Sequence, residues 1–125
     1  MTSVPGSSDV FLGGFVTYNN EMKKTLLGVS AGTLETYGAV SAQCAHEMVA
    51  GCAKRTGAHW SVAVTGIAGP GGGSTEKPVG TVFIAVSGQN GTHVTEYLFV
   101  GGREGVRIRS TQSALALLRE QILSS

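Results

Sequence analysis

The chain has 125 residues, of which 42% are hydrophobic and only 14% charged, and its net charge is +1. This length and composition predict one folded domain rather than a disordered tail, and the near-neutral charge lacks the basic footprint of a nucleic-acid-binding protein. Without a signal peptide or an apolar run of the roughly 18 residues that a membrane span needs, we expect a cytoplasmic protein that binds no membrane. Because so few residues are charged, part of the surface of the folded chain is expected to be apolar. We expect a homo-oligomer that covers this apolar surface.

The first half of the chain is predicted to hold one strand followed by three helices. Residues 10–18 have the aromatic and β-branched composition of a strand. Short helices are expected over residues 21–27 and 30–37, each ended by a glycine. A longer helix is expected from an N-cap at Ser41 to about residue 55.

The second half is predicted to hold three strands and a final helix. Residues 60–64 are almost continuously apolar, which indicates a strand buried on both faces. Strands over residues 79–87 and 92–100 flank a hairpin turn at Gln89-Asn90-Gly91, and residues 103–123 form an amphipathic helix. The order of elements predicts one α/β domain over residues 1–125, with a mixed, partly antiparallel sheet and helices on both of its faces.

A loop rich in glycine lies between the two strands in the middle of the chain. So many glycines indicate that the backbone approaches either a ligand or another piece of backbone. The loop is no P-loop, because Lys77 is followed by Pro78 rather than by Ser or Thr. It is no dinucleotide fingerprint either, because a strand follows it instead of a helix. An anion-binding loop and a flexible surface connection remain as alternatives.

Two groups of polar residues suggest chemistry. Ser8, Tyr18 and Lys23 have the types that a serine nucleophile with a Tyr–Lys base system needs, although they could equally be unrelated surface residues. Arg103 and Arg107 are four residues apart near the start of the last helix and share one of its faces. They could clamp a phosphate or form a solvated first turn.

Neither a metal site nor a disulfide is predicted. The histidines His46, His59 and His93 have no further ligand at metal-binding spacing. Cys44 and Cys52 are eight residues apart on the predicted helix, which separates their Cα atoms by about 12 Å. A disulfide cannot span that distance, so we expect free thiols in a reducing compartment.

Several motifs, taken together and in this order, resemble one known family. The chain is similar to the CinA C-terminal domain, the competence/damage-inducible protein family whose stand-alone members are nicotinamide-nucleotide amidases, and the resemblance covers nearly the whole chain. The motifs that carry it are Pro5-Gly-Ser-Ser8, Gly14-Phe-Val-Thr-Tyr-Asn19 with Lys23, Gly38-Ala-Val-Ser41, Thr65-Gly-Ile-Ala-Gly-Pro-Gly-Gly72 and Lys77-Pro-Val-Gly-Thr81.

The resemblance implies hydrolysis of the carboxamide of nicotinamide mononucleotide to nicotinic acid mononucleotide and ammonia, without a metal or cofactor. It implies Ser8 as the nucleophile, activated by Tyr18 and Lys23. The residues that it implies for substrate binding are Ser7, Thr65, Gly66, Gly69, Arg103 and Arg107.

The chain departs from the family pattern at its start. Family members are expected to begin about forty residues earlier, with a helix, a strand and an Ala-Glu-Ser-Cys-Thr-Gly-Gly segment, none of which is in this sequence. The missing strand would belong to the sheet and the missing segment to a wall of the active site. We therefore expect an N-terminally truncated domain with an exposed sheet edge. A non-catalytic nucleotide-binding or oligomerisation module is the alternative function.

Overall fold

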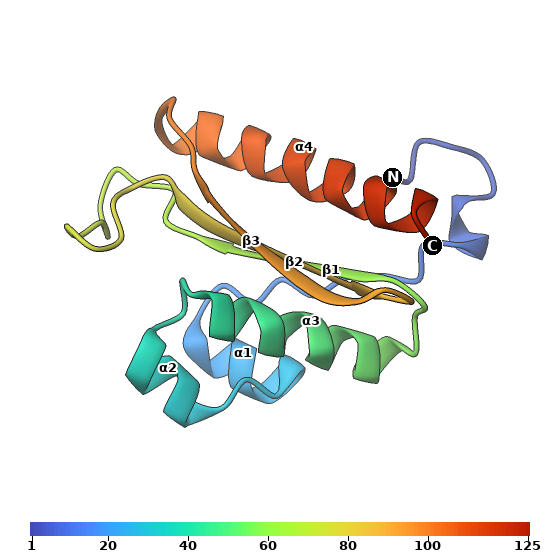
Figure 1. Ribbon diagram of the computed structural model, residues 1–125, viewed down its shortest axis with the longest axis horizontal. Helices are drawn as coiled ribbons and strands as arrows, with labels where there is room; N and C mark the ends of the chain where they lie inside the picture. The colour runs from blue at the N-terminus through green and yellow to red at the C-terminus, as the bar shows by residue number, and fades with distance from the viewer.

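A three-stranded sheet forms the middle layer of the protein, and helices cover both of its faces (Figure 1). The computed structural model describes residues 1–125. On one face α3 packs on the sheet with α1 and α2 against it, and the last helix crosses the other face, which confirms the predicted α/β layering. In chain order the elements are a 3-10 turn η1 (Ser7–Asp9), α1 (Asn20–Leu27), α2 (Ala31–Tyr37), α3 (Ala42–Thr56), β1 (Ser61–Gly66), β2 (Thr81–Gly88), β3 (Gly91–Leu98) and α4 (Gly102–Leu123).

The sheet is wholly antiparallel rather than mixed. The strand order is β1-β2-β3, and both neighbouring pairs run antiparallel. Each pair is joined by a loop without a crossover helix, and such connections produce antiparallel neighbours. The turn between β2 and β3 is the predicted one, since Gly88 pairs with Gly91.

Local capping signals fix where the helices begin and end. The side chains of Asn19, Ser30 and Ser41 each accept a hydrogen bond from a backbone N–H in the first turn of the helix that follows. Gly28 and Gly57 end α1 and α3 in the left-handed conformation, with φ of 72° and 70°. The predicted helix bounds are therefore confirmed to within one residue.

The helices bury one core on each face of the sheet. The core under α4 consists of Val82, Ile84, Val106 and Ala114. The core under α1 and α3 is larger and consists of Leu27, Val29, Cys44, Ala45, Met48, Val49, Ala63 and Ala85. Both thiols are free, as expected from their spacing.

The predicted strand over residues 10–18 is absent. The segment has no regular secondary structure and no strand partner. The side chains of Val10, Val16 and Tyr18 are 82%, 87% and 85% exposed. A strand needs a neighbour that takes up its backbone hydrogen bonds, and no other segment of this chain supplies one.

The prediction that the first sheet strand is buried on both faces is also wrong. In β1, Ser61, Ala63 and Thr65 are buried against the α3 side, whereas Val64 on the opposite side is 39% exposed. β1 is an edge strand, and α4 packs mainly over β2. One helix is too narrow to cover the outer strand completely.

No helix of the chain has the length and hydrophobicity that crossing a membrane requires.

Candidate functional site

Lys23 is a lysine with an unusual environment. It lies in the first turns of α1 and is only 8% exposed, although lysines are almost never buried without a partner. Its Nζ donates a hydrogen bond to the carbonyl of Thr17 at 2.9 Å. The single ion pair in the chain joins Lys24 to Glu21, so the Lys23 ammonium has no carboxylate partner. The adjacent Tyr18 points its ring into solvent.

The turn between α2 and α3, residues 38–41, is fixed by two hydroxyl groups. Ser41 Oγ donates to the Gly38 carbonyl at 2.9 Å and accepts from the Cys44 N–H at 3.1 Å. Thr65, near the end of β1, donates its Oγ1 hydrogen to the Ala39 carbonyl at 2.8 Å. The predicted substrate-binding residue Thr65 therefore holds this turn against the end of the sheet.

The glycine loop, residues 67–80 between β1 and β2, is tied to both layers of helices. Lys77 Nζ donates to the carbonyl of Tyr37 at the end of α2. Arg103 Nη1, at the start of α4, donates to the carbonyl of Gly69 at 3.0 Å. The loop therefore bridges one end of the molecule, which is its projecting end in Figure 1, and it is not a freely flexible connection.

Glycine is required in and before this loop because the chain packs against itself. A Cβ atom on Gly66 would lie 2.7 Å from Val82, and one on Gly69 would lie 2.5 Å from Val79, with Gly69 also at a φ of +84°. Contacts this short are far inside van der Waals range. Of the two sequence-based alternatives, close approach to other parts of the chain accounts for these two glycines.

The two arginines lie across the sheet from Lys23. They belong to α4, which covers the face opposite to α1 and α3 (Figure 1). The guanidinium of Arg103 is engaged with the glycine loop, and Arg107 is exposed. The predicted arginine pair therefore does not lie near Lys23. Arg103 instead holds the glycine loop through its hydrogen bond to Gly69.

The predicted nucleophile lies apart from its predicted partners. Ser7 and Ser8 belong to η1, which sits beside the C-terminal end of α4, whereas α1 lies under the other half of the sheet (Figure 1). No hydrogen bond joins Ser8 to Tyr18 or Lys23. The exposed segment 10–18 connects the two places.

The charges of two lysines influence the pKa of the buried Cys44 thiol. Burial raises the pKa of this thiol, the charges of Lys23 and Lys77 oppose that rise, and Glu47 adds to it. The two ammonium groups themselves donate to backbone carbonyls, Lys23 to Thr17 and Lys77 to Tyr37. Sequence reasoning did not place Lys77 in the site, although it belongs to the Lys-Pro-Val-Gly motif.

Glu47 links α3 to α2 and was missed because nothing local in the sequence marks it. Its carboxylate accepts hydrogen bonds from the Ser30 N–H at 2.8 Å and from the Thr33 hydroxyl. Burial alone would raise the pKa of this carboxyl, but these hydrogen bonds, together with His46, hold it below its usual value.

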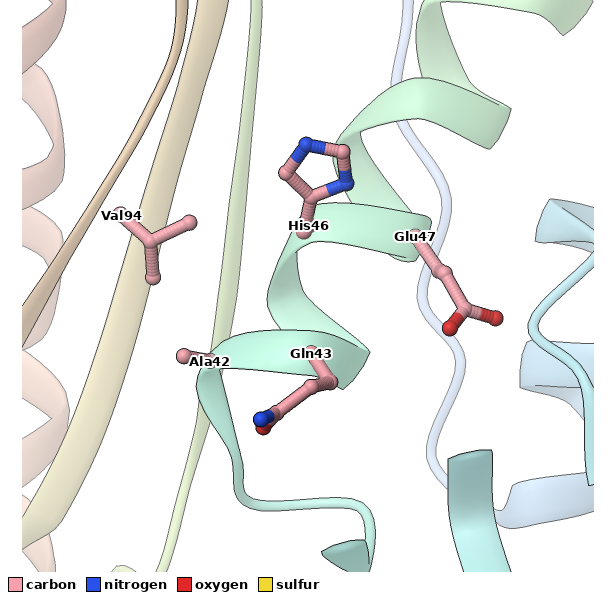
Figure 2. Close-up of a pocket in the computed structure, with 5 residues that line it drawn as sticks. All are labelled: Ala42, Gln43, His46, Glu47 and Val94. Carbon is pink, nitrogen blue, oxygen red and sulfur yellow. The ribbon is translucent and has the colours of Figure 1, made fainter. Parts of the chain in front are cut away.

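A cleft of about 350 Å³ lies between α3 and β3. Figure 2 shows His46 and Val94 on its walls, while Glu47 leaves α3 on the side away from Val94. Apart from Glu47 the lining comprises Ala42, Gln43, His46 and Val94. None of the predicted catalytic or substrate-binding residues lines this cleft.

Comparison with known proteins identifies the family. The profile of the CinA C-terminal domain matches residues 1–122. The chain belongs to this family. It is 52% identical over 98% of its length to a CinA-like protein of Thermotoga neapolitana and 50% identical over 98% to one of Leptospira biflexa, and it spans 30% of each relative. The chain thus corresponds to less than a third of the curated relatives that it matches.

Solved structures of the family share the fold. The competence/damage-inducible protein of Agrobacterium tumefaciens superposes with a TM-score of 0.83 at 48% identity, covering 86% of this chain and 66% of that one. A CinA superfamily protein of Escherichia coli gives 0.83 at 38% identity, covering 86% and 63%. The α/β architecture is therefore that of the CinA superfamily.

Proposed function

We propose that this CinA-family chain is an amidohydrolase that converts nicotinamide mononucleotide to nicotinic acid mononucleotide and ammonia. In the proposed reaction Ser8 Oγ attacks the carboxamide carbon, and Tyr18 and Lys23 take up its proton and return it to the leaving ammonia. Water then hydrolyses the acyl-enzyme and releases Ser8. Fold alone does not imply function, so the proposal depends on the residues.

The burial of Lys23 is the observation that carries the proposal. An ammonium group with only a carbonyl acceptor is costly to bury. The acceptor for Lys23 is the carbonyl of Thr17, which precedes Tyr18 in the chain, while the Tyr18 ring itself is exposed. A lysine in such surroundings favours deprotonation of a nearby hydroxyl. A purely structural lysine would be expected to reach a carboxylate or solvent instead.

The reaction requires Ser8 to approach Lys23 by a rearrangement of segment 10–18. This segment has no strand partner, and its apolar side chains are largely exposed. Few contacts therefore oppose a different path. We expect the segment to follow another course when substrate is bound.

The test is ammonia release from nicotinamide mononucleotide by the wild type and by three variants. Ser8→Ala and Lys23→Met are expected to lower kcat by about a hundredfold or more, because each removes a participant in proton transfer or nucleophilic attack. Ser3→Ala, an exposed serine near the same end of the chain, serves as the matched control and should leave kcat unchanged. Equal rates for Ser8→Ala and the wild type would refute the assignment of the nucleophile.

The separation of Ser8 from Lys23 favours a second candidate, a nucleotide-binding or oligomerisation module without catalytic activity. This candidate predicts that calorimetry detects binding of nicotinamide mononucleotide while no ammonia is released at any substrate concentration. Release of ammonia that depends on Ser8 would exclude it.

A further inference from the structure

Two lysines on the α3 side of the sheet have no counter-ion. Lys23 donates to the Thr17 carbonyl and Lys77 to the Tyr37 carbonyl. Neither lies within ion-pair distance of a carboxylate, since the single ion pair of the chain is on the outside of α1. A carbonyl satisfies a donor hydrogen but leaves the full positive charge uncompensated.

Glu47, on α3, does not pair with either lysine. The charge of Glu47 raises the pKa of the Cys44 thiol, whereas the charges of the two lysines lower it. The two carboxylate oxygens of Glu47 are taken by the Ser30 N–H and the Thr33 hydroxyl. The Glu47 carboxylate therefore points toward the start of α2. Partly buried charges are strongly stabilised by an opposite charge, so the region is suited to an anion.

Lys77 is the lysine placed to meet a ligand. Lys23 is almost completely buried, whereas Lys77 is half-buried and is carried by the glycine loop. A tight turn orients it, because the Ser74 N–H donates to the Lys77 carbonyl at 2.9 Å and the Lys77 N–H donates to Ser74 Oγ at 3.0 Å. Its flexible stem allows the ammonium to leave a neutral carbonyl for a charged oxygen.

Gly38 lies beside the Lys77 ammonium group. A Cβ atom on Gly38 would lie 3.4 Å from Lys77 Nζ. Gly38 is also the first residue of the turn 38–41, which hydrogen bonds from Thr65 and Ser41 hold in place. The Lys77 ammonium therefore lies next to a turn that hydrogen bonds hold in place. This turn is formed by the Gly38-Ala-Val-Ser41 motif.

We propose that Lys77 binds the phosphate group of the nucleotide substrate, exchanging the Tyr37 carbonyl for a phosphate oxygen. This inference rests on the proposed function for the identity of the ligand, but it concerns binding and not turnover. The competing explanation is that Lys77 only fastens the glycine loop to α2.

Calorimetry with two ligands separates these explanations. The probes are nicotinamide mononucleotide and nicotinamide riboside, which lacks the phosphate, with inorganic phosphate as a competitor at constant ionic strength. The wild type is expected to bind the mononucleotide at least about tenfold more tightly than the riboside, because a hydrogen bond to a charged group contributes about that factor. Inorganic phosphate should weaken only mononucleotide binding.

Lys77→Met is expected to abolish the preference while leaving riboside affinity unchanged, and Lys77→Arg to retain most of it. Lys54→Met removes an exposed lysine of α3 and should behave as the wild type. A thermal melt of each variant reports on folding, and Lys77→Arg keeps the comparison valid if Lys77→Met melts early.

Three results would overturn the inference: equal affinity of the wild type for both ligands, no binding of either, or an equal loss of both affinities in Lys77→Met. The last outcome is what a simple fastening role predicts. A chain that shows a Lys77-dependent preference but releases no ammonia would refute the proposed function and leave this inference standing. Ammonia release that depends on Ser8, together with a Lys77→Met variant that still prefers the mononucleotide over the riboside, would support the proposed function and refute this inference.

Discussion

Gly51, in the second half of α3, packs directly against the C-terminal end of α1. A Cβ atom added there would lie 1.8 Å from the carbonyl oxygen of Leu27 and 2.6 Å from its carbonyl carbon. Leu27 is the last residue of α1 and is buried in the core. We predict that Gly51→Ala forces the two helices apart by roughly 1 Å or more before the contact becomes an ordinary one.

The free energy of unfolding is expected to fall by about 2 kcal/mol. Overpacking of a rigid contact costs about 3 kcal/mol at the upper end of its usual range, because a backbone carbonyl cannot rotate away as a side chain does. Replacing a helical glycine with alanine returns about 1 kcal/mol through helix propensity. For a domain of this size the net loss corresponds to a melting temperature lower by about 8 °C.

Urea unfolding followed by circular dichroism measures the effect, and Gly32→Ala is the matched control. Gly32 lies in α2, and a Cβ atom added there would have no other atom within 4 Å. The same substitution at this position should therefore stabilise the protein by about 0.5–1 kcal/mol. The two variants are thus expected to change stability in opposite directions. A Gly51→Ala protein at least as stable as the wild type would refute the inferred contact between α1 and α3.

Two further predictions concern polar contacts between elements. The pKa of Glu47 is lower in the folded chain than its ordinary value of 4.5, so its contribution to stability is present above that pH and is lost as the pH falls through the folded pKa. Urea midpoints between pH 6 and pH 3 should therefore fall more steeply for the wild type than for Glu47→Gln, and parallel curves would contradict this. Arg103→Met frees the Gly69 carbonyl and is expected to lower stability by about 1 kcal/mol and to speed amide exchange in the glycine loop. Arg107→Met, which breaks no such contact, should change neither, and equal exchange rates in the two variants would disprove the fastening role of Arg103.

The helices were predictable because their signals are local. Ser41 caps α3, and Gly28 and Gly38 end α1 and α2, as the sequence indicates. The hairpin between β2 and β3 was equally predictable from three consecutive residues. The motifs also identified the CinA family, because they record the order of residue types directly.

The strands and the site were less predictable because they depend on distant partners. The composition of residues 10–18 fits a strand, but no neighbour takes up its backbone hydrogen bonds. The apolar run of β1 gives no sign that Val64 stands at the margin of the layer covered by α4. The sequence also could not show that Arg103 faces the glycine loop across the sheet from Lys23.

The sequence by itself determined the helices, the β2–β3 turn and the family, since each depends on neighbouring residues or on motif order. Only the tertiary structure decided where the charged side chains of Lys23, Lys77 and Glu47 lie relative to one another. Lys23 and Lys77 are more than fifty residues apart in the chain, yet the charges of both lower the pKa of the buried Cys44 thiol. Glu47 meanwhile is turned toward α2. Electrostatic energy depends on distance in space and on burial, and both are set by how α1, α3 and the glycine loop pack together.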